Sequence, residues 1–237
     1  MRGTIHGLLN PCAELALAAR ADGPKSTLMK LADPIPLLTS PVIPVVTINR
    51  AADAVSLARA LLAGGLHVVE VTLRTPAALE AVRAIVAEVP DMIVGVGTVL
   101  KPLDVTRAVD AGADFLVSPG TPLGLAQALA DAPIPALPGC ATVSEAMVLA
   151  VLGFPLLKFF PAEPSGGVRW LKAVAEPLPE ARFCPTGGVN ADNAAAYLAL
   201  PNVVAVGGSW VASAQAIVAG DFSEITSRAR AAAALRR

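Results

Sequence analysis

The chain has 237 residues, of which 54% are hydrophobic and 16% are charged. A chain of this length and composition can bury one large core, and it is too short for two ordinary domains of equal size. Its formal net charge is -1, so it has no long-range attraction to nucleic acid or to an anionic membrane. We therefore expect neither nucleic acid nor a membrane as a partner.

Residues 1–25 are rich in alanine, carry no recognisable chemistry and are broken by Asp-Gly-Pro at 22–24. We expect them to form a partly ordered extension of a single domain that covers residues 26–237. That domain is predicted to begin with a short helix at 26–31. The first clear strand is predicted at 41–48 (PVIPVVTI), which is β-branched and almost wholly apolar.

The rest of the chain repeats one unit, a short apolar strand followed by an amphipathic helix. The first helix is predicted at 51–63, where Gly64-Gly65 ends it. Later helices are predicted to start at Thr75-Pro76 (N-cap and N1), at Lys101-Pro102, at Thr121-Pro122 and at the capping box Thr142-x-x-Glu145. Further strands are predicted at 67–72, 92–96, 115–117, 134–137, 156–160, 182–186 and 203–206.

Eight strand-plus-helix units fill the length of a small (β/α)8 barrel, the TIM barrel. Strands without polar alternation are covered on both faces, as they are in a parallel sheet. A doubly wound open sheet is the alternative fold, but such sheets rarely need eight units of this regularity. We therefore predict a single-domain α/β protein with the (β/α)8 barrel fold.

A stretch without charge lies at residues 193–220, which contain no Asp, Glu, Lys or Arg over a length that could span a bilayer. Pro201, Asn202 and the pair Gly207-Gly208 interrupt it, a pattern that fits helix, turn, strand, turn and helix better than a continuous span. No apolar run of signal-peptide length precedes Glu14. We therefore expect a cytoplasmic protein.

Lys158 lies in the middle of the apolar run Leu156-Leu157-Lys158-Phe159-Phe160, which is predicted to be a buried strand. Ammonium groups are almost never fully buried unless they are paired or have a task. Burial disfavours the charged form, so a lysine here can lose its proton near neutral pH and become a nucleophile. The alternative is a lysine that extends from the strand end and keeps its ammonium group in water.

The carboxyl ends of barrel strands carry the reacting groups of such folds. If the apolar neighbours of Glu70 and Lys158 face the helices, strand alternation turns both charged side chains into the barrel. A functional pair is one interpretation, and a buried structural salt bridge is the other. Arg74, four residues beyond Glu70, can bind a substrate carboxylate bidentately, or it can be a surface arginine paired with a loop acid.

Glycine pairs follow the last two predicted strands, where many barrels hold a phosphate group. Gly187-Gly188 come directly after Thr186, and Gly207-Gly208 come directly before Ser209. Glycines allow backbone N–H groups to approach an anion closely, and the N-terminus of a following helix adds partial positive charge. Simple turn glycines are the alternative, but two pairs at these two strands favour a phosphate site.

Metal and other nucleophile chemistries find little support in the sequence. Cys12, Cys140 and Cys184 are too few and too scattered for a disulfide framework or a zinc site. His6 lies in the extension and His67 starts its strand at the far end, so we expect both to be structural or solvated. No His, Asp and Glu residues have metal-ligand spacing, and no histidine is placed for a Ser-His-Asp triad. We therefore expect no metal and no cofactor.

Several segments closely resemble, in order, those of the bacterial 2-keto-3-deoxy-6-phosphogluconate (KDPG) aldolases of the Entner-Doudoroff pathway, class I aldolases that also act on 2-keto-4-hydroxyglutarate (KHG). The resemblance extends from about residue 26 to residue 217, and residues 1–25 exceed the family pattern. It implies a (β/α)8 barrel assembled as a homotrimer. The segments are PVIPVV, GG-x-x-VVEVTLRTP, VGVGTVL, SPG, PGCATVSE, KFFPAE, FCPTGGVN and GGSWV.

The resemblance also implies roles for individual residues. Lys158 is similar to the Schiff-base lysine of the family, and Glu70 to its general acid/base. Arg74 and Thr98 resemble the residues that hold the pyruvyl carboxylate, and Pro119 and Phe160 resemble residues that line the site. The implied phosphate-binding residues are Thr186, Gly187, Gly188, Gly208 and Ser209.

The implied reaction is the reversible cleavage of KDPG to pyruvate and glyceraldehyde 3-phosphate by a metal-independent carbon–carbon lyase. Neutral Lys158 would attack the keto carbon, and the resulting iminium would accept the electrons of the broken C3–C4 bond. Glu70 would move the protons. Sister activities on the C4 epimer, 2-keto-3-deoxy-6-phosphogalactonate, or on KHG remain open, as does a non-catalytic protein that binds a phosphorylated ligand.

Overall fold

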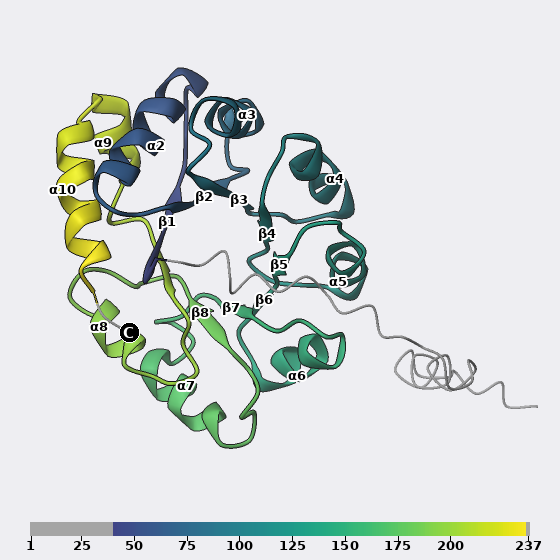
Figure 1. Ribbon diagram of the computed structural model, residues 1–237. Helices are drawn as coiled ribbons and strands as arrows, with labels where there is room; N and C mark the ends of the chain where they lie inside the picture. Colours follow the sequence, from purple (N-terminus) through teal and green to yellow (C-terminus); the bar gives the residue numbers. More distant parts are fainter. Residues whose placement is uncertain (1–39, 236–237) are drawn as a thin grey trace, which may run out of the picture. The chain divides into compact units, whose positions relative to one another are not determined.

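The computed structural model describes residues 40–235. The predicted extension at 1–25 and the predicted short helix at 26–31 lie outside these residues. Parallel strands and helices alternate along the described chain (Figure 1). The strands are β1 (Val42–Val46), β2 (Val68–Thr72), β3 (Ile93–Gly97), β4 (Phe115–Val117), β5 (Ala136–Leu137), β6 (Gly139–Cys140), β7 (Leu157–Phe159), β8 (Phe183–Pro185) and β9 (Val206–Gly208).

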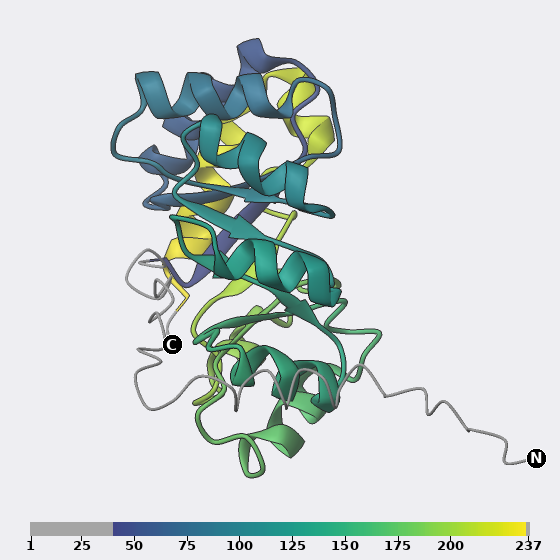
Figure 2. The same ribbon diagram turned by 90° about the vertical axis from the view of Figure 1, so that its right-hand side faces the viewer.

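Helices follow the strands and lie outside them (Figures 1 and 2). The first begins as a short 3-10 turn, η2 (Ala51–Asp53), which continues directly into α2. The α-helices are α2 (Ala54–Ala63), α3 (Ala78–Glu88), α4 (Pro102–Asp110), α5 (Leu123–Ala130), α6 (Val143–Val151), α7 (Gly167–Ala175), α8 (Ala194–Leu198), α9 (Ala214–Ala219) and α10 (Phe222–Ala233).

The strands form a curled parallel sheet in two hydrogen-bonded parts, with the orders β5-β4-β3-β2-β1-β9 and β6-β7-β8. Of the strand predicted at 134–137, only Ala136–Leu137 is regular (β5), and a second two-residue strand, β6, follows directly after Pro138. Proline has no N–H to donate to a ladder. The chain therefore changes partners at this residue, from β4 on one side to β7 on the other.

The last predicted strand, 203–206, is displaced toward the C-terminus. Val203 lies opposite Phe183 of β8, whose N–H donates to the Asn202 carbonyl and whose carbonyl accepts from the Val204 N–H. Only from Val206 onward does the chain pair with β1. The regular strand β9 is therefore Val206–Gly208. Hydrogen bonds to two different neighbours decide this boundary, and the apolar run by itself contains no sign of them.

The start of α3 differs from the prediction, because Thr75 does not cap it. The Thr75 hydroxyl donates to the carbonyl of Ile48 at 2.5 Å, and α3 begins at Ala78. The capping box at Thr142 and Glu145 is confirmed at the start of α6, as is the end of α2 at Gly64. A helix start predicted from Thr-Pro alone therefore fails where the hydroxyl has a better acceptor on a neighbouring strand.

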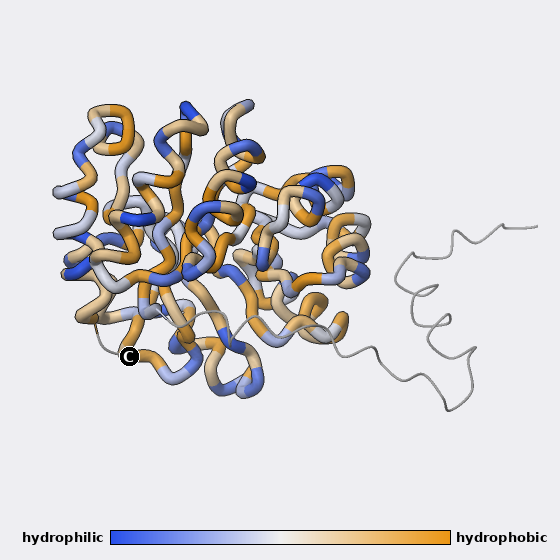
Figure 3. The backbone as a smooth tube through the Cα atoms, turned by 45° about the horizontal axis from the view of Figure 1, so that its top comes forward, coloured by the Kyte–Doolittle hydropathy of each residue, from blue (hydrophilic) through white to orange (hydrophobic). Residues whose placement is uncertain are grey.

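The buried apolar side chains form two clusters, one on each face of the strands. The larger cluster lies between the strands and the helices, and it includes Val69, Val71, Leu157 and Phe159. Hydrophilic and hydrophobic stretches alternate along the helices (Figure 3), as expected where one helix face covers a sheet. The smaller, inner cluster consists of Ile43, Val68, Phe115, Val117, Leu137, Leu156, Cys184, Val204 and Ala205.

The uncharged stretch at 193–220 is divided among α8, β9 and α9, in the predicted order of helix, strand and helix. Between residues 40 and 235, no helix has the length and apolar character needed to cross a bilayer. The α/β fold with parallel strands, in which each strand carries one face toward the helices and one toward the inner cluster, agrees with the sequence pattern.

Candidate active site

Lys158 and Glu70 meet on the inner face of the strands. Phe159 faces outward, where its ring stacks on Trp170 of α7 with the ring centroids 4.2 Å apart. Successive side chains of a strand point to opposite faces, so Lys158 points inward. The same alternation turns Glu70 inward, because its neighbours Val69 and Val71 belong to the outer cluster.

The two side chains form a buried ion pair. Lys158 Nζ lies 3.0 Å from one carboxylate oxygen of Glu70 and 3.3 Å from the other. Only 6% of the lysine side chain and 5% of the glutamate side chain are exposed. A lysine that extends into water, the alternative considered from sequence, is therefore wrong. A buried ion pair contributes little net stability, because desolvation opposes the attraction between the charges.

The neighbouring strand β3 leaves room for this pair by having glycine at position 97, and room for Phe115 by having glycine at position 95. A Cβ at Gly97 would overlap the carboxylate of Glu70, and a Cβ at Gly95 would overlap the ring of Phe115. Glu70 pairs in register with Gly95, one strand away. Glycine at 97 therefore permits the Glu70 side chain to take the conformation that reaches Lys158.

We expect Gly97→Ala to lower turnover by roughly 10²-fold, since displacement of a catalytic group by about 1 Å can have an effect of that size. The added methyl group would push the Glu70 carboxylate away from Lys158 Nζ. Steady-state kinetics with KDPG, the substrate that the resemblance implies, measures the effect. Gly124→Ala in α5 is the matched control, because a Cβ there meets no atom within 4 Å. Equal activity of both variants would contradict the expected displacement.

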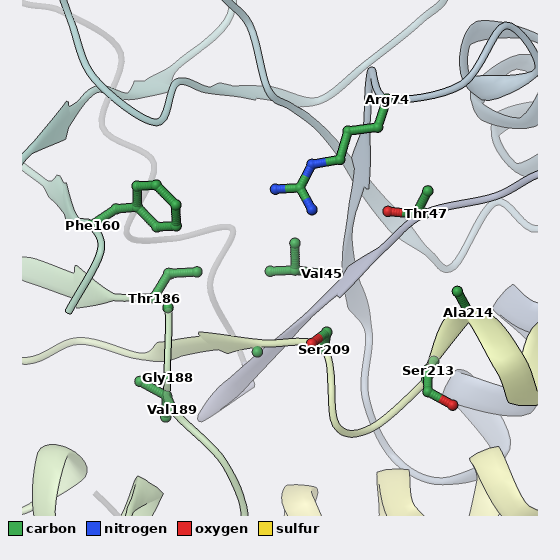
Figure 4. A pocket seen from close by; sticks show the side chains of 13 residues that line it. Val45, Thr47, Arg74, Phe160, Thr186, Gly188, Val189, Ser209, Ser213 and Ala214 are labelled. Carbon is green, nitrogen blue, oxygen red and sulfur yellow. The ribbon is translucent and has the colours of Figure 1, made fainter. Parts of the chain in front are cut away.

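A cavity of about 370 Å³ opens beside the ion pair at the carboxyl ends of the strands (Figure 4). Lys158 adjoins the cavity, because its Nζ lies 5.5 Å from the centre of the Phe160 ring, which lines the cavity. Glu70 adjoins it as well, because its backbone pairs with that of the lining residue Val45. Seven of the predicted site residues line it: Arg74, Phe160, Thr186, Gly187, Gly188, Gly208 and Ser209.

Arg74 extends its guanidinium group into this cavity from the loop after β2 (Figure 4). Within residues 40–235, no Asp or Glu forms an ion pair with it. The alternative of a surface arginine paired with a loop acid is therefore wrong for the described part of the chain. A guanidinium group with free donors that faces a cavity is suited to bind a carboxylate.

Thr98 and Pro119 do not line the cavity, although both follow strands at the same end of the sheet. Thr98 has a φ of 61°, a left-handed conformation that costs about 1–3 kcal/mol for a residue that is not glycine. The backbone of Pro119 packs against Gly139, where a Cβ would overlap it. The structure therefore does not bring these two predicted residues to the cavity wall.

The loop after β8 is shaped by its glycines and held by its neighbours. Gly187 and Gly188 have φ values of 96° and 82°, which favour glycine. The Gly187 carbonyl accepts from the Glu163 N–H at 3.0 Å, and the Gly188 carbonyl accepts from Asn193 Nδ2 at 3.1 Å. No acceptor in the described chain bonds the N–H groups of Gly187 and Gly188, so both are available to an anion.

The motif-based prediction missed six residues that line the cavity: Val45, Thr47, Val189, Ala212, Ser213 and Ala214. Strand alternation could have found Val45 and Thr47, since they continue the inward column that starts at Ile43. Ala212, Ser213 and Ala214 lie at the start of α9, and their sequence carries no comparable signal. Tertiary structure alone brings this helix start to the cavity.

Two other candidate nucleophiles, the thiols of Cys184 and Cys140, are buried. Burial raises the pKa of the Cys184 thiol, which belongs to the inner cluster, to about 12. Burial, with a smaller contribution from Glu145, raises the pKa of Cys140 to about 12 as well. Thiols in this state are not nucleophilic at neutral pH. In the described part of the chain, no three His, Cys, Asp or Glu side chains are grouped as metal ligands would be.

Two of the solved structures similar to this chain are KDPG aldolases with a bound small molecule. The KDPG aldolase of Legionella pneumophila, captured with pyruvate as a covalent carbinolamine intermediate, is 45% identical with a TM-score of 0.84, and the match covers 86% of this chain and 99% of that one. The KDPG aldolase of Zymomonas mobilis with 3-phosphoglycerate is 43% identical with a TM-score of 0.78, over 89% and 95% of the two chains.

Sequence comparison agrees with these structures. The KHG/KDPG aldolase of Escherichia coli K12 is 49% identical over 196 residues, which cover 83% of this chain and 92% of the relative. The 2-dehydro-3-deoxy-phosphogluconate aldolase of Dickeya dadantii is 49% identical over 198 residues, or 84% and 93% of the two chains. The family model described as "KDPG and KHG aldolase" matches residues 36–228, which confirms the resemblance found in the motifs. The chain belongs to the KDPG and KHG aldolase family.

Proposed function

We propose that the protein is a class I aldolase that reversibly cleaves KDPG to pyruvate and glyceraldehyde 3-phosphate. The observation that carries this proposal is the buried pair of Lys158 Nζ and the Glu70 carboxylate, 3.0 Å apart beside an open cavity. The Legionella relative supports it, because pyruvate forms a covalent carbinolamine in that enzyme. The Zymomonas relative, solved with 3-phosphoglycerate, supports a phosphorylated substrate.

The chemistry begins with a proton transfer within the pair. The Glu70 carboxylate accepts a proton from Lys158 Nζ, and the neutral amine attacks the C2 carbonyl carbon of the substrate. The carbinolamine then loses water, with Glu70 as the proton donor, to leave a protonated imine between Lys158 and C2. This cation draws the electron pair of the C3–C4 bond toward nitrogen.

Cleavage requires that the C4 hydroxyl lose its proton, which passes to Glu70 directly or through a water molecule. The C3–C4 bonding pair becomes the enamine double bond, and C4 leaves as the aldehyde carbon of glyceraldehyde 3-phosphate. Protonation of the enamine at C3 and hydrolysis of the imine release pyruvate and restore Lys158. Because the iminium is the electron sink, we propose that the reaction needs neither a metal ion nor an organic cofactor.

The two ends of the substrate are assigned to opposite sides of the cavity. Arg74 is assigned to the C1 carboxylate and Phe160 to the reacting carbons, and the family resemblance adds Thr98 to the first and Pro119 to the second. The phosphate is assigned to backbone N–H groups and hydroxyls after β8 and β9. These residues are Thr186, Gly187, Gly188, Gly208 and Ser209.

KHG is a second candidate substrate, since the Escherichia coli relative is named for both compounds. The phosphogalactonate epimer has less support, because the KDPGal structure is only 26% identical, with a TM-score of 0.72. A non-catalytic protein that binds a phosphorylated ligand would need neither Lys158 nor Glu70. The buried pair of Lys158 and Glu70 therefore favours an enzyme over a non-catalytic binding protein.

We also propose that the curled sheet closes into the predicted (β/α)8 barrel. β5 and β6 belong to one strand segment interrupted by Pro138, and Thr186, directly after β8, bridges to Gly207 of β9, which pairs with β1. These contacts support a continuous ring of strands. Assembly as a homotrimer, cytoplasmic location and the domain boundary at residue 26 stay predictions.

The proposed function is tested by trapping the imine. The protein is incubated with pyruvate, reduced with borohydride, digested and analysed by peptide mass spectrometry. We expect one adduct on Lys158, and none when either pyruvate or borohydride is left out. If the folded protein carries no adduct on Lys158, the class I mechanism is wrong.

A further inference from the structure

Thr47 places a hydroxyl group in the wall of the cavity at the end of β1. It lines the cavity together with Val45 and Arg74, and its hydroxyl points toward the open space in Figure 4. None of the proposed steps uses this residue. Ile43 and Val45, the inward residues of β1, are both apolar, so Thr47, directly after β1, is the first polar residue on this side of the strand.

The hydrogen bonds of Thr47 determine what it can offer to a ligand. Thr72 donates its single hydroxyl proton to the carbonyl of Val46 at 2.9 Å. Thr47 and Thr72 have their hydroxyl oxygens 3.0 Å apart, so Thr47 must be the donor in that contact, because each hydroxyl carries one proton. Thr47 Oγ1 therefore presents acceptor lone pairs to the cavity. Such an oxygen binds a ligand hydroxyl, whereas carboxylate and phosphate oxygens have no proton to give it.

The position of β1 in the sheet determines which part of the substrate lies next to Thr47. β1 pairs with β2 on one side and with β9 on the other, so it lies between Arg74, assigned to the C1 carboxylate, and Ser209, assigned to the phosphate. Glu70 is level with Val45, and Thr47 is two residues nearer the mouth. The C4 hydroxyl is assigned to Glu70, C3 carries no hydroxyl, and the C5 hydroxyl is the group that remains.

We infer that Thr47 is a specificity-determining residue whose Oγ1 accepts a hydrogen bond from the C5 hydroxyl of KDPG. This inference rests on the proposed aldolase function. KHG has an ionised carboxylate at C5, which cannot donate to Thr47. The contact therefore favours the phosphorylated six-carbon substrate over KHG at a point separate from the phosphate loops.

The test compares kcat/KM for KDPG and for KHG in three forms of the full-length protein. We expect Thr47→Val to lower the ratio of kcat/KM for KDPG to kcat/KM for KHG about three- to tenfold, which is the effect of one net hydrogen bond. Thr47→Ser, which restores a hydroxyl, is expected to recover most of the ratio. Thr47→Val leaves no buried donor unpaired, since Thr72 still donates to Val46, so the variant should fold.

The matched control is Thr106→Val, which makes the same substitution on the exposed surface of α4 and should keep the wild-type ratio. An unchanged ratio in Thr47→Val, or an equal loss for both substrates, would overturn the assignment of Thr47 while the aldolase function stands. A wild-type protein that cleaves neither substrate and forms no pyruvate adduct would instead overturn the function on which the inference rests.

Discussion

Lys158→Met is expected to abolish cleavage of KDPG, with a loss in kcat on the order of 10⁴-fold or more, as is typical when a covalent nucleophile is removed. Methionine fills a similar volume but has no amine to form the iminium. The pyruvate adduct trapped by borohydride should disappear with the activity. An adduct that persists in this variant would show that another group is the nucleophile.

The same substitution is expected to destabilise the protein, because it leaves the Glu70 carboxylate buried without its partner. Glu70 is 5% exposed in the pair, and removal of one member of a buried ion pair typically lowers the free energy of unfolding by about 3–5 kcal/mol. Denaturant titration measures this change. The double variant Lys158→Met/Glu70→Gln should regain most of the loss, since its buried side chains carry no charge.

Glu70→Gln is expected to reduce turnover by roughly 10²- to 10⁴-fold, the range typical for loss of a general acid/base. Glutamine has nearly the same shape, and its amide oxygen can still accept from Lys158 Nζ, but it cannot take up and return a proton. The variant should still bind pyruvate. Kinetics of KDPG cleavage and pyruvate binding by calorimetry separate the two effects.

Glu88→Gln is the matched control for this substitution. Glu88 forms an ion pair with Arg59 on the protein surface, where 56% of the Glu88 side chain is exposed. Glu88 does not line the cavity. We expect its kinetics to equal those of the wild type. Unchanged turnover in Glu70→Gln would remove Glu70 from the mechanism, and loss of pyruvate binding would indicate that it acts through the structure of the site.

Local sequence determines much of this protein. Apolar strands followed by amphipathic helices specify the α/β fold, because the periodicity of 2 or 3.6 residues settles which face of each element is buried. The alternation around Lys158 and around Glu70 predicts that both side chains point inward. The motifs were specific enough to predict the family, and the glycine pairs predict the loops that line the cavity.

Tertiary structure decides what depends on neighbouring strands. A second short strand, β6, follows the predicted one because the chain changes partners at Pro138. β9 starts at Val206 because the preceding residues pair with β8. Thr75 bonds to Ile48 in place of its helix. Each of these outcomes depends on which backbone acceptor lies nearest in space, and residues far apart in sequence supply that acceptor.

The site itself shows the same division. Sequence alone identifies Lys158 and Glu70 as candidates, but their separation of 3.0 Å spans 88 positions of the chain and follows from the register of the strands between them. Gly97 makes room for that contact, and the proton that Thr72 gives to Val46 leaves Thr47 as the donor to Thr72. The sequence determines which types of reacting groups the protein has. The distance between Lys158 and Glu70, and the lone pairs that Thr47 presents to the cavity, are determined only when the strands pack together.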